Sequence, residues 1–214
     1  MIIAVDGPTA SGKGTISRQL AHHYRLPLLD TGLLYRAVGW TLRAQGGDAD
    51  DASEALAACG FHNDLLADPG LRSEEVGGLA SRVSVHPVVR NALDKRQKDF
   101  ANQPGGAVLD GRDIGTVIAP DADAKLFVIA KPEARALRRF SEMKSRGEPA
   151  VYEDILADIV KRDERDQNRA AAPLKPAEDA DLLDTSDLTI RVAVQQAIAL
   201  VDARISRRVD IDPT

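Results

Sequence analysis

Gly7-Pro8-Thr9-Ala10-Ser11-Gly12-Lys13-Gly14-Thr15 is a G-x-x-x-x-G-K loop that follows a short apolar run at residues 2–6 and leads into a helical pattern at residues 13–24. The glycines permit backbone angles that aim successive N–H groups inward, and the following helix adds its positive N-terminal end. Lys13 supplies a mobile cation for the outer phosphates. A tight turn alone would not explain why strand, loop and helix occur together. We therefore predict that the whole loop forms a nucleoside-triphosphate site.

Short apolar runs alternate with longer helical patterns along the rest of the chain. The predicted strands are residues 2–6, 27–30, 107–110, 125–130 and 182–184. The predicted helices are residues 13–24, 32–44, a pair within 74–101, 133–144, 153–169 and 190–208. This alternation is typical of βαβ units, so we predict an α/β protein with a five-stranded parallel sheet flanked by helices.

Two segments depart from the simple alternation. The stretch between the second and third strands, roughly seventy residues, exceeds an ordinary crossover helix and indicates a helical insertion. The short stretch 145–150, with Gly147 and Pro149, interrupts two helices and is a candidate hinge or lid. We therefore predict one domain whose core is about 1–36, 104–140 and 170–214, with an insertion at about 37–103 and a lid region at about 141–169.

Asp110 closes the third apolar run, as a magnesium-binding carboxylate does at the end of a parallel strand. Many strands end in Asp, but here Gly111-Arg112-Asp113 follows and places two carboxylates and a guanidinium within a short stretch. We therefore expect Asp110 to bind Mg²⁺, directly or through water.

Arginines near residue 165 form a candidate second anion site. Arg162, Arg165, Asp166 and Arg169 are spaced so that one face of a helix carries them all. A solvated helix with internal ion pairs would look the same. However, an enzyme that joins two anions needs several arginines beside the phosphate loop, which favours a catalytic role.

A smaller socket is predicted where the second strand ends. Thr31 caps the next helix and Arg36 follows within its first turns. The hydroxyl, the helix N-terminus and the guanidinium together suit a monophosphate.

Several motifs occur together in a family-specific order: the phosphate loop, Asp30-Thr31-Gly32 with Tyr35-Arg36, Asp110-Gly111-Arg112-Asp113-Ile114-Gly115-Thr116, and 162–169 followed by Ala172-Pro173-Leu174. Over nearly the whole chain this pattern resembles the bacterial cytidylate kinases, a family of P-loop kinases. The resemblance implies transfer of the γ-phosphoryl group of Mg-ATP to CMP or dCMP in pyrimidine nucleotide metabolism. It also implies that the Thr15 hydroxyl faces Mg²⁺, because Gly14 stands where many P-loops have Ser or Thr.

The resemblance also implies roles for the acceptor residues. Thr31, Arg36 and Arg112 would hold the monophosphate. Ser81, Arg90 and Asp113 would read cytosine, with hydroxyl and guanidinium donors on O2 and N3 and a carboxylate accepting from the exocyclic amine. Arg162 and Asp166 would lie near the sugar and Arg169 near the phosphate. The implied catalytic residues are Lys13, Arg112, Arg162 and Arg169.

Two departures from the family pattern stand out. Thr31 replaces the common Ser and keeps its hydroxyl. The stretch 60–78 looks shorter and less strand-like than the small sheet-bearing insertion of many family members, so the insertion is predicted to be helical.

Composition limits the alternatives. With 28 Lys plus Arg against 33 Asp plus Glu, the net charge is −5, and the chain has one cysteine, Cys59, and 4% aromatic residues. We expect no nucleic-acid partner, no membrane span and a cytoplasmic monomer. Two alternatives stay open: a P-loop kinase for another small acceptor, such as a different nucleoside monophosphate or shikimate, and a non-kinase nucleotide-binding module. The absence of an N-K-x-D tetrapeptide weighs against a GTP switch.

Overall fold

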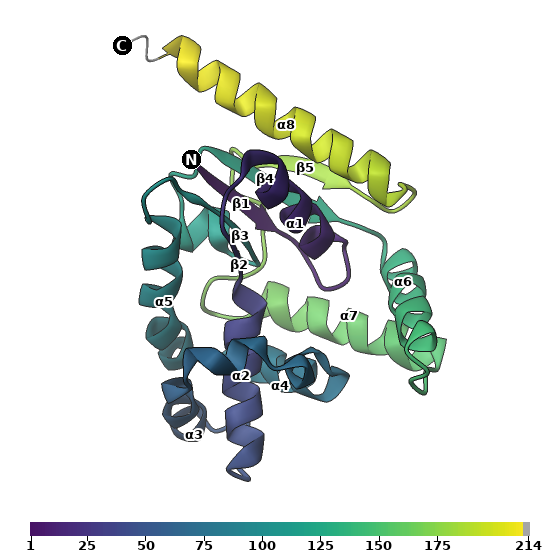
Figure 1. Ribbon diagram of the computed structural model, residues 1–214. Coiled ribbons are helices and arrows are strands. Elements are labelled where there is room, and N and C mark those ends of the chain that lie inside the picture. The colour runs from purple at the N-terminus through teal and green to yellow at the C-terminus, as the bar shows by residue number, and fades with distance from the viewer. Residues whose placement is uncertain (212–214) are drawn as a thin grey trace.

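A five-stranded parallel sheet lies at the centre of the protein (Figure 1). The computed structural model describes residues 1–211, with side chains described up to residue 207. The strand order is β2-β3-β1-β4-β5, and every neighbouring pair is parallel. The strands are β1 (Ile2–Asp6), β2 (Leu28–Asp30), β3 (Ala107–Gly111), β4 (Ala124–Ile129) and β5 (Asp181–Asp184). The predicted sheet is confirmed, with strand ends shifted by one residue.

The strand order places the phosphate loop at the point where the chain reverses its direction across the sheet. Strand β1 lies between β3 and β4, and the loop follows the carboxyl end of β1. Ligands of open parallel sheets bind in the crevice outside such a switch point. Asp6 and Asp110 lie near the same edge, because Val5 pairs with Asp110 and Asp6 pairs with Gly111.

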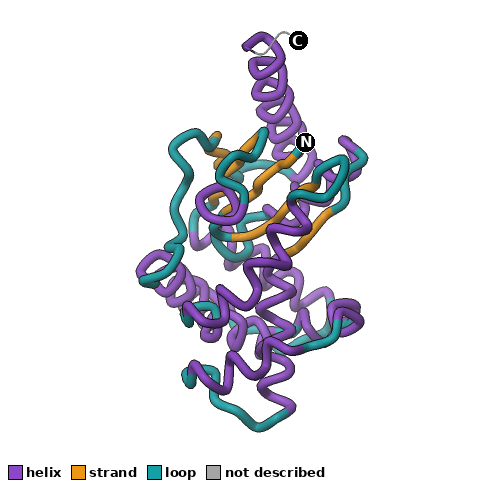
Figure 2. The backbone as a smooth tube through the Cα atoms, turned by 90° about the vertical axis from the view of Figure 1, so that its left-hand side faces the viewer, coloured by secondary structure: helices purple, strands orange, loops and turns teal. Residues whose placement is uncertain are grey.

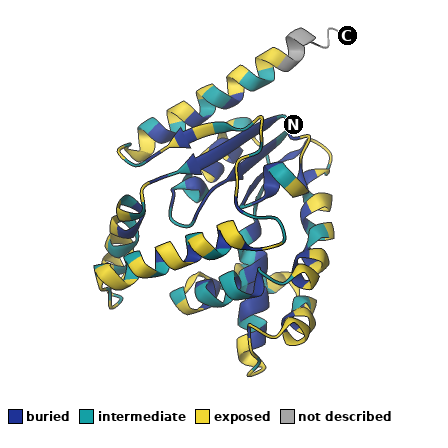
Figure 3. Ribbon diagram, turned by 180° about the vertical axis from the view of Figure 1, so that it is seen from behind, coloured by how far each residue is buried: buried dark blue, intermediate teal, exposed yellow. Residues whose placement is uncertain are grey.

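Helices cover both faces of this sheet (Figure 2). Helices α1 (Lys13–Tyr24) and α8 (Ile190–Ile211) share one hydrophobic cluster with Ile3 and Val5 of β1. Ala4 points the other way and packs with residues of α5 (Pro87–Ala101) and of the π-helical turn η4 (Ile114–Ile118). Because both faces are covered, the three central strands β1, β3 and β4 are mostly apolar and buried, as Figure 3 shows, whereas the edge strands β2 and β5 are only partly buried.

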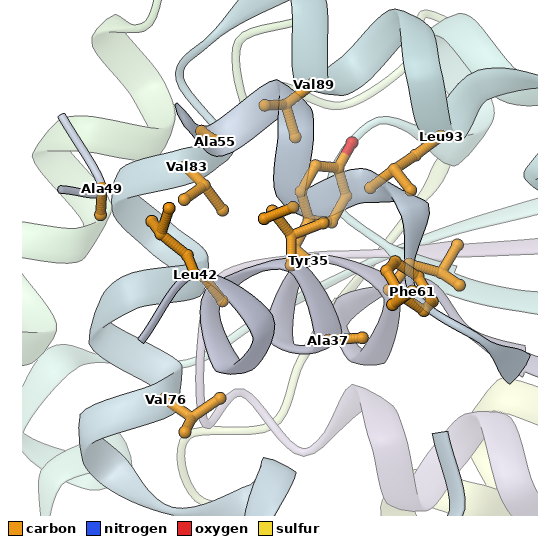
Figure 4. Close-up of a cluster of buried hydrophobic side chains, with 14 of the residues drawn as sticks. Tyr35, Ala37, Leu42, Ala49, Ala55, Phe61, Val76, Val83, Val89 and Leu93 are labelled. Atoms are coloured by element: carbon orange, nitrogen blue, oxygen red, sulfur yellow. The ribbon is translucent and has the colours of Figure 1, made fainter. Parts of the chain in front are cut away.

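The chain between β2 and β3 is helical and has a hydrophobic core of its own (Figure 4). Its elements are α2 (Thr31–Ala44), α3 (Ala52–Ala57), η1 (Ala58–Gly60), η2 (Asn63–Ala67), η3 (Pro69–Arg72), α4 (Glu74–Val83) and α5. Leu42, Val76, Val83 and Leu93 are fully buried within it. The expected helical insertion is present, and stretch 60–78 contains only 3₁₀ turns and helix.

Helices α6 (Pro132–Ser145) and α7 (Tyr152–Asn168) pack against each other and are joined by a turn with Gly147 at φ +72°. Figure 1 shows α7 running beneath the sheet towards α4. The predicted end of this helix at Arg169 is wrong by one residue. Helix α7 ends at Asn168, and Arg169 has an extended backbone with φ −63° and ψ 141°. The chain turns here because Leu174 N–H donates to the Asp166 carbonyl and the Arg169 Nε donates to the Ala172 carbonyl.

Within residues 1–211, no helix combines the length and the apolar character that a membrane span requires.

Candidate active site

The phosphate loop is shaped by backbone angles that few residues adopt. Gly7 has φ +152° and Gly12 has φ +92°, and Ala10 between them has φ +56°. A Cβ atom on Gly7 would lie 2.1 Å from the Val128 carbonyl oxygen, so the loop packs directly on β4. Left-handed angles followed by a helix start create a concave run of N–H groups, which suits an anion.

Lys13 is buried at the floor of this loop. Its Nζ donates to the Pro8 carbonyl at 3.1 Å and lies 4.0 Å from Asp110 Oδ1. Burial, reinforced by the charge of Arg112, lowers the pKa of Lys13 to about 8. Burial also raises the pKa of Asp110 to about 6, although Lys13 opposes the shift. The two groups face each other across a gap, so a phosphate that approaches Lys13 would restore a full counter-charge to it.

Asp110 also lies against the first turn of α1. A Cβ atom on Gly14 would be 3.2 Å from Asp110 Oδ2, so a glycine leaves room for this carboxylate. Thr15 follows, and its Oγ1 accepts from Arg18 at 3.3 Å. Thr15 and Asp110 line the same cavity. A hydroxyl and a carboxylate oxygen are hard donors that fit Mg²⁺, which keeps several waters and takes phosphate oxygens as further ligands. Among the described residues, no group of three His, Cys, Asp or Glu side chains could hold a metal alone.

The cavity at the phosphate loop is large, at about 1370 Å³, and extends to the start of α8. Arg138 of α6 borders it and donates to Thr185 Oγ1 at 3.0 Å. Leu188, Ile190 and Ala193 give that end an apolar lining. The sequence reasoning assigned none of these residues, because their approach to the loop depends on how α6 and α8 pack.

A second cavity of about 90 Å³ lies beside the first, and all the residues predicted to hold the acceptor line it. These residues are Thr31, Arg36, Ser81, Arg90, Arg112, Asp113, Arg162, Asp166 and Arg169. They come from α2, α4, α5, the end of β3 and the α7 region. The fold therefore gathers segments that are far apart in the sequence into one polar pocket.

Both carboxylates of this second pocket are paired with arginines, which outnumber them five to two. Arg90 Nη2 donates to Asp113 Oδ2 at 2.5 Å, and Arg169 Nη2 lies 3.7 Å from Asp113 Oδ1. Arg112 Nε donates to Asp166 Oδ2 at 3.0 Å. These pairs keep each carboxylate supplied with a cation while the site is buried.

Two predicted acceptor hydroxyls already have partners. Ser81 Oγ accepts from Arg165 at 2.6 Å. Thr31 Oγ1 donates to the Asp110 carbonyl at 2.8 Å, which ties α2 to the end of β3. Thr31 would have to rotate its hydroxyl before it could donate to a phosphate.

Tyr35 is an acceptor-pocket residue to which the sequence reasoning gave no role. Its ring is buried, lines the pocket and lies 5.5 Å from the Arg90 guanidinium carbon. Burial raises the pKa of its phenol. The signal was present, since Tyr35 stands one helical turn after Thr31.

Asp6 is a second residue that the sequence reasoning missed. Its carboxylate is buried and accepts the backbone N–H groups of Ile114 and Gly115, each at 2.8 Å. Burial raises the pKa of Asp6 to about 7 against these hydrogen bonds. The contact joins the end of β1 to the segment after Asp113, so Asp6 positions that segment.

Arg135 joins α6 to the phosphate loop. Its Nη1 donates to the Thr9 carbonyl at 3.2 Å and to Asp163 Oδ1 at 3.0 Å. Its side chain is 3% exposed, so the pair with Asp163 of α7 is shielded from water. This buried ion pair couples the α6–α7 hairpin to the loop.

A parallel sheet with a phosphate loop at its switch point, beside a second pocket rich in arginine, defines a P-loop protein built to bring two phosphorylated ligands together. Residues 3–203 match the sequence model of the family described as Cytidylate kinase. The chain therefore belongs to the cytidylate kinase family.

Individual relatives agree with this assignment. A cytidylate kinase from Rhodopseudomonas palustris (strain ATCC BAA-98 / CGA009) is 58% identical, with 97% of this chain and 99% of the relative covered. A cytidylate kinase from Xanthobacter autotrophicus (strain ATCC BAA-1158 / Py2) is also 58% identical, with 97% and 100% covered. The crystal structure of an uncharacterized protein from Eubacterium ventriosum shares the fold at a TM-score of 0.56 and 15% identity, with 95% of this chain and 99% of that chain covered.

Proposed function

We propose that this cytidylate kinase transfers the γ-phosphoryl group of Mg-ATP to CMP or dCMP, giving ADP and CDP or dCDP. The observation that carries the proposal is the second pocket, in which all the expected acceptor residues meet next to the phosphate-loop cavity. Gly32, Arg36 and Arg112 line both cavities, so the two ligands would meet at these residues.

The donor would bind along the larger cavity. The loop N–H groups and Lys13 would hold its phosphates, and its base would lie towards Arg138 and the apolar residues at the start of α8. Thr15 and Asp110 would hold Mg²⁺, which when bound supplies charge neutralisation at the outer phosphates.

The acceptor would be read by its base and held by its phosphate. Asp113 would accept from the exocyclic amine of cytosine, a donor that uracil lacks, while Ser81 and Arg90 would donate to the ring acceptors. Arg162 and Asp166 would contact the sugar.

The reaction needs no covalent intermediate on the enzyme. An oxygen of the acceptor phosphate attacks the γ-phosphorus, and the bond between that phosphorus and the bridging oxygen of the donor breaks, leaving ADP. Arg112, Arg162 and Arg169 would stabilise the transferring group in line with the acceptor.

The second pocket has to open to admit its ligand. Its 90 Å³ is well below the roughly 300 Å³ at the lower end of small-molecule sites. We therefore propose that the region 37–103 and the α6–α7 hairpin move on binding, and that closure excludes water until both substrates are present. Crystal structures with and without CMP in which neither element moves would contradict this part.

The test is ADP production from Mg-ATP with CMP, dCMP, UMP, AMP and shikimate presented separately to the purified protein. Fast turnover with CMP and dCMP and slow turnover with UMP is the expected result. Turnover with another acceptor alone would preserve the donor chemistry and overturn the base-reading residues. No turnover with any acceptor, despite ATP binding, would favour a binding module instead.

A further inference from the structure

Glu74 links helices that otherwise belong to different parts of the molecule. It is the first residue of α4, where Ser73 caps the helix. Its Oε1 is in contact with the Arg139 guanidinium of α6, and its Oε2 lies 3.8 Å from Arg162 Nη2 of α7. Its side chain is 34% exposed, against 20% for Arg139 and 10% for Arg162, so the carboxylate is half-buried and contacts two more deeply buried guanidinium groups.

A third guanidinium approaches the same place. A Cβ atom on Gly77, one turn further along α4, would lie 2.8 Å from Arg36 Nη2 and 3.2 Å from Arg162 Nη1. Burial and the charges of Arg162 and Arg139 lower the pKa of Arg36 to about 10. The three cations are therefore close enough to repel one another measurably.

The carboxylates around these arginines differ in their exposure and in whether they lie on the same helix as the arginine they contact. Arg162 has a second partner on its own helix, Asp158, at 2.7 Å, and Arg139 has Glu142 at 3.0 Å. Those two carboxylates are 47% and 56% exposed, and each lies on the same helix as its arginine. Glu74 is more buried than either and bridges two helices, so it is the carboxylate between the arginines.

We propose that Glu74 is a positioning residue whose carboxylate occupies the anionic place beside Arg139 and Arg162 that a substrate phosphate takes in the complex. A carboxylate and a phosphate offer guanidinium groups the same kind of paired, charge-assisted acceptor oxygens. While Glu74 holds Arg139 and Arg162, it keeps α4 against the α6–α7 hairpin, and Glu74 and both arginines line the larger cavity. An incoming phosphate has to displace the Glu74 carboxylate, which lowers the affinity of the enzyme for that phosphate.

This inference rests on the proposed phosphoryl transfer, but it is tested by an anion that needs no transfer. Glu74→Gln keeps the shape and removes the charge. Glu75→Gln is the matched control, because Glu75 is also in the first turn of α4 but pairs with Arg43 at 2.6 Å. Both variants lose a carboxylate at a helix N-terminus, so the difference between them isolates the arginine contact.

The measurement is calorimetric titration of wild type and both variants, first with inorganic phosphate and then with CMP. We expect Glu74→Gln to bind both ligands about fivefold more tightly, a change typical of losing one partly exposed ion pair. Glu75→Gln should bind as wild type does. A residue with a merely structural role would not tighten binding when removed. Glu74→Asp, which keeps the charge, should stay closer to wild type than Glu74→Gln.

Two outcomes separate the failure of this inference from the failure of the proposed function. If CMP is bound and phosphorylated while Glu74→Gln leaves phosphate affinity unchanged or weaker, the role of Glu74 is wrong and the kinase activity stands. If the wild type phosphorylates no CMP while phosphate binding still tightens in Glu74→Gln, the acceptor assignment is wrong and the role of Glu74 stands. Should Glu74→Gln melt far below Glu75→Gln, Glu74→Ala carries the same expectation.

Discussion

The phosphate loop and the acceptor pocket are built in opposite ways. The loop is one contiguous stretch whose backbone angles at Gly7, Ala10 and Gly12 create the site. The acceptor pocket is assembled from side chains of α2, α4, α5, α7 and the segments that follow β3 and α7, and its two carboxylates are paired with arginines, as Asp113 is with Arg90. The first cavity is about 1370 Å³ and the second about 90 Å³.

This difference indicates which features determine ligand binding at the phosphate loop and at the acceptor pocket. Main-chain donors are present before any ligand arrives, so the donor side is preorganised. Under the proposed function the acceptor side would exchange internal ion pairs for contacts to substrate, so its arginines would change partners on binding. Changes on the donor side should therefore affect the chemical step most, and changes on the acceptor side should affect which substrate is used.

The largest effect is expected at Lys13. Lys13→Met removes the cation at the floor of the loop, and we expect kcat to fall about 100- to 1000-fold. Lys95→Met is the control, because Lys95 is exposed on α5 and pairs with Asp99. Initial rates of ADP formation measure the change. Nearly normal kcat in Lys13→Met would mean that the loop works through its backbone alone.

The next effect concerns the choice of acceptor. Asp113→Asn replaces a carboxylate that would accept from the cytosine amine by a group that can also donate, so the preference for CMP over UMP should narrow. The expected change in the ratio of kcat/KM values is about 10- to 100-fold. Asp94→Asn, at a partly exposed carboxylate paired with Lys98 on α5, should leave the ratio unchanged. An unaltered ratio in Asp113→Asn would show that Asp113 does not distinguish cytosine from uracil.

A smaller effect is expected at Asp6, which ends β1 just before the phosphate loop and accepts hydrogen bonds from the segment after Asp113. Asp6→Asn can accept only one of the two N–H groups now bonded to the carboxylate, so a buried donor is left unpaired. We expect the free energy of unfolding to fall by about 1–3 kcal/mol. Urea titration measures it. A loss well below this range would mean that the loop after Asp113 holds its place without Asp6.

The raised pKa of Asp6 gives the same variant a pH signature. Asp6 has a pKa of about 7 in the folded protein, against an ordinary aspartate pKa of 3.8, so the folded state binds more protons than the unfolded state between these pH values. The contribution of Asp6 to stability is therefore complete below about pH 4 and is lost as the pH rises through about 7. Wild type should lose stability over this window relative to Asp6→Asn. Parallel pH profiles in the two proteins would contradict the shift.

The smallest effect on the rate is expected when a change of pH alters the charges of Asp110 and Lys13 at the donor cavity. Asp110 has a pKa of about 6 and has to be ionised to hold Mg²⁺. Between pH 7 and pH 5 the ionised fraction falls about tenfold, so kcat/KM for Mg-ATP should fall by a similar factor. Above about pH 8 Lys13 loses its charge and the rate should fall again. A kcat/KM profile that stays flat from pH 5 to 7 would show that the rate does not depend on ionisation of Asp110.

What could be predicted from the sequence follows the same division. The phosphate loop and Asp110 with its neighbours are local, so their order along the chain is enough to recognise them. The three central strands β1, β3 and β4 were recognisable because burial on both faces makes them mostly apolar, whereas the edge strands β2 and β5 are short and only partly buried. Thr31, Arg36 and the arginines of residues 162–169 were predicted from local patterns. The base-reading residues Ser81, Arg90 and Asp113 came from the resemblance to a family, since no local pattern connects them.

Contacts that form only when helices pack against one another could not be predicted from the sequence. Arg135 reaches Thr9 and Asp163 from a helix whose docking no motif encodes. Glu74 stands in an ordinary helix start, and its partners on α6 and α7 come from the tertiary fold. Arg169 was placed on a helix by its spacing, but α7 ends one residue earlier because the following turn takes over its hydrogen bonds.

The separate hydrophobic core between β2 and β3 has a consequence for how the protein could change over time. Leu42, Val76 and Val83 are buried among helices of that region, while the cluster of Ile3 and Val5 holds the sheet. A unit with its own core can open and close, or accumulate substitutions, without disturbing its neighbour. A lineage could therefore acquire a new acceptor by replacing helices α2 to α5 while inheriting the phosphate loop unaltered.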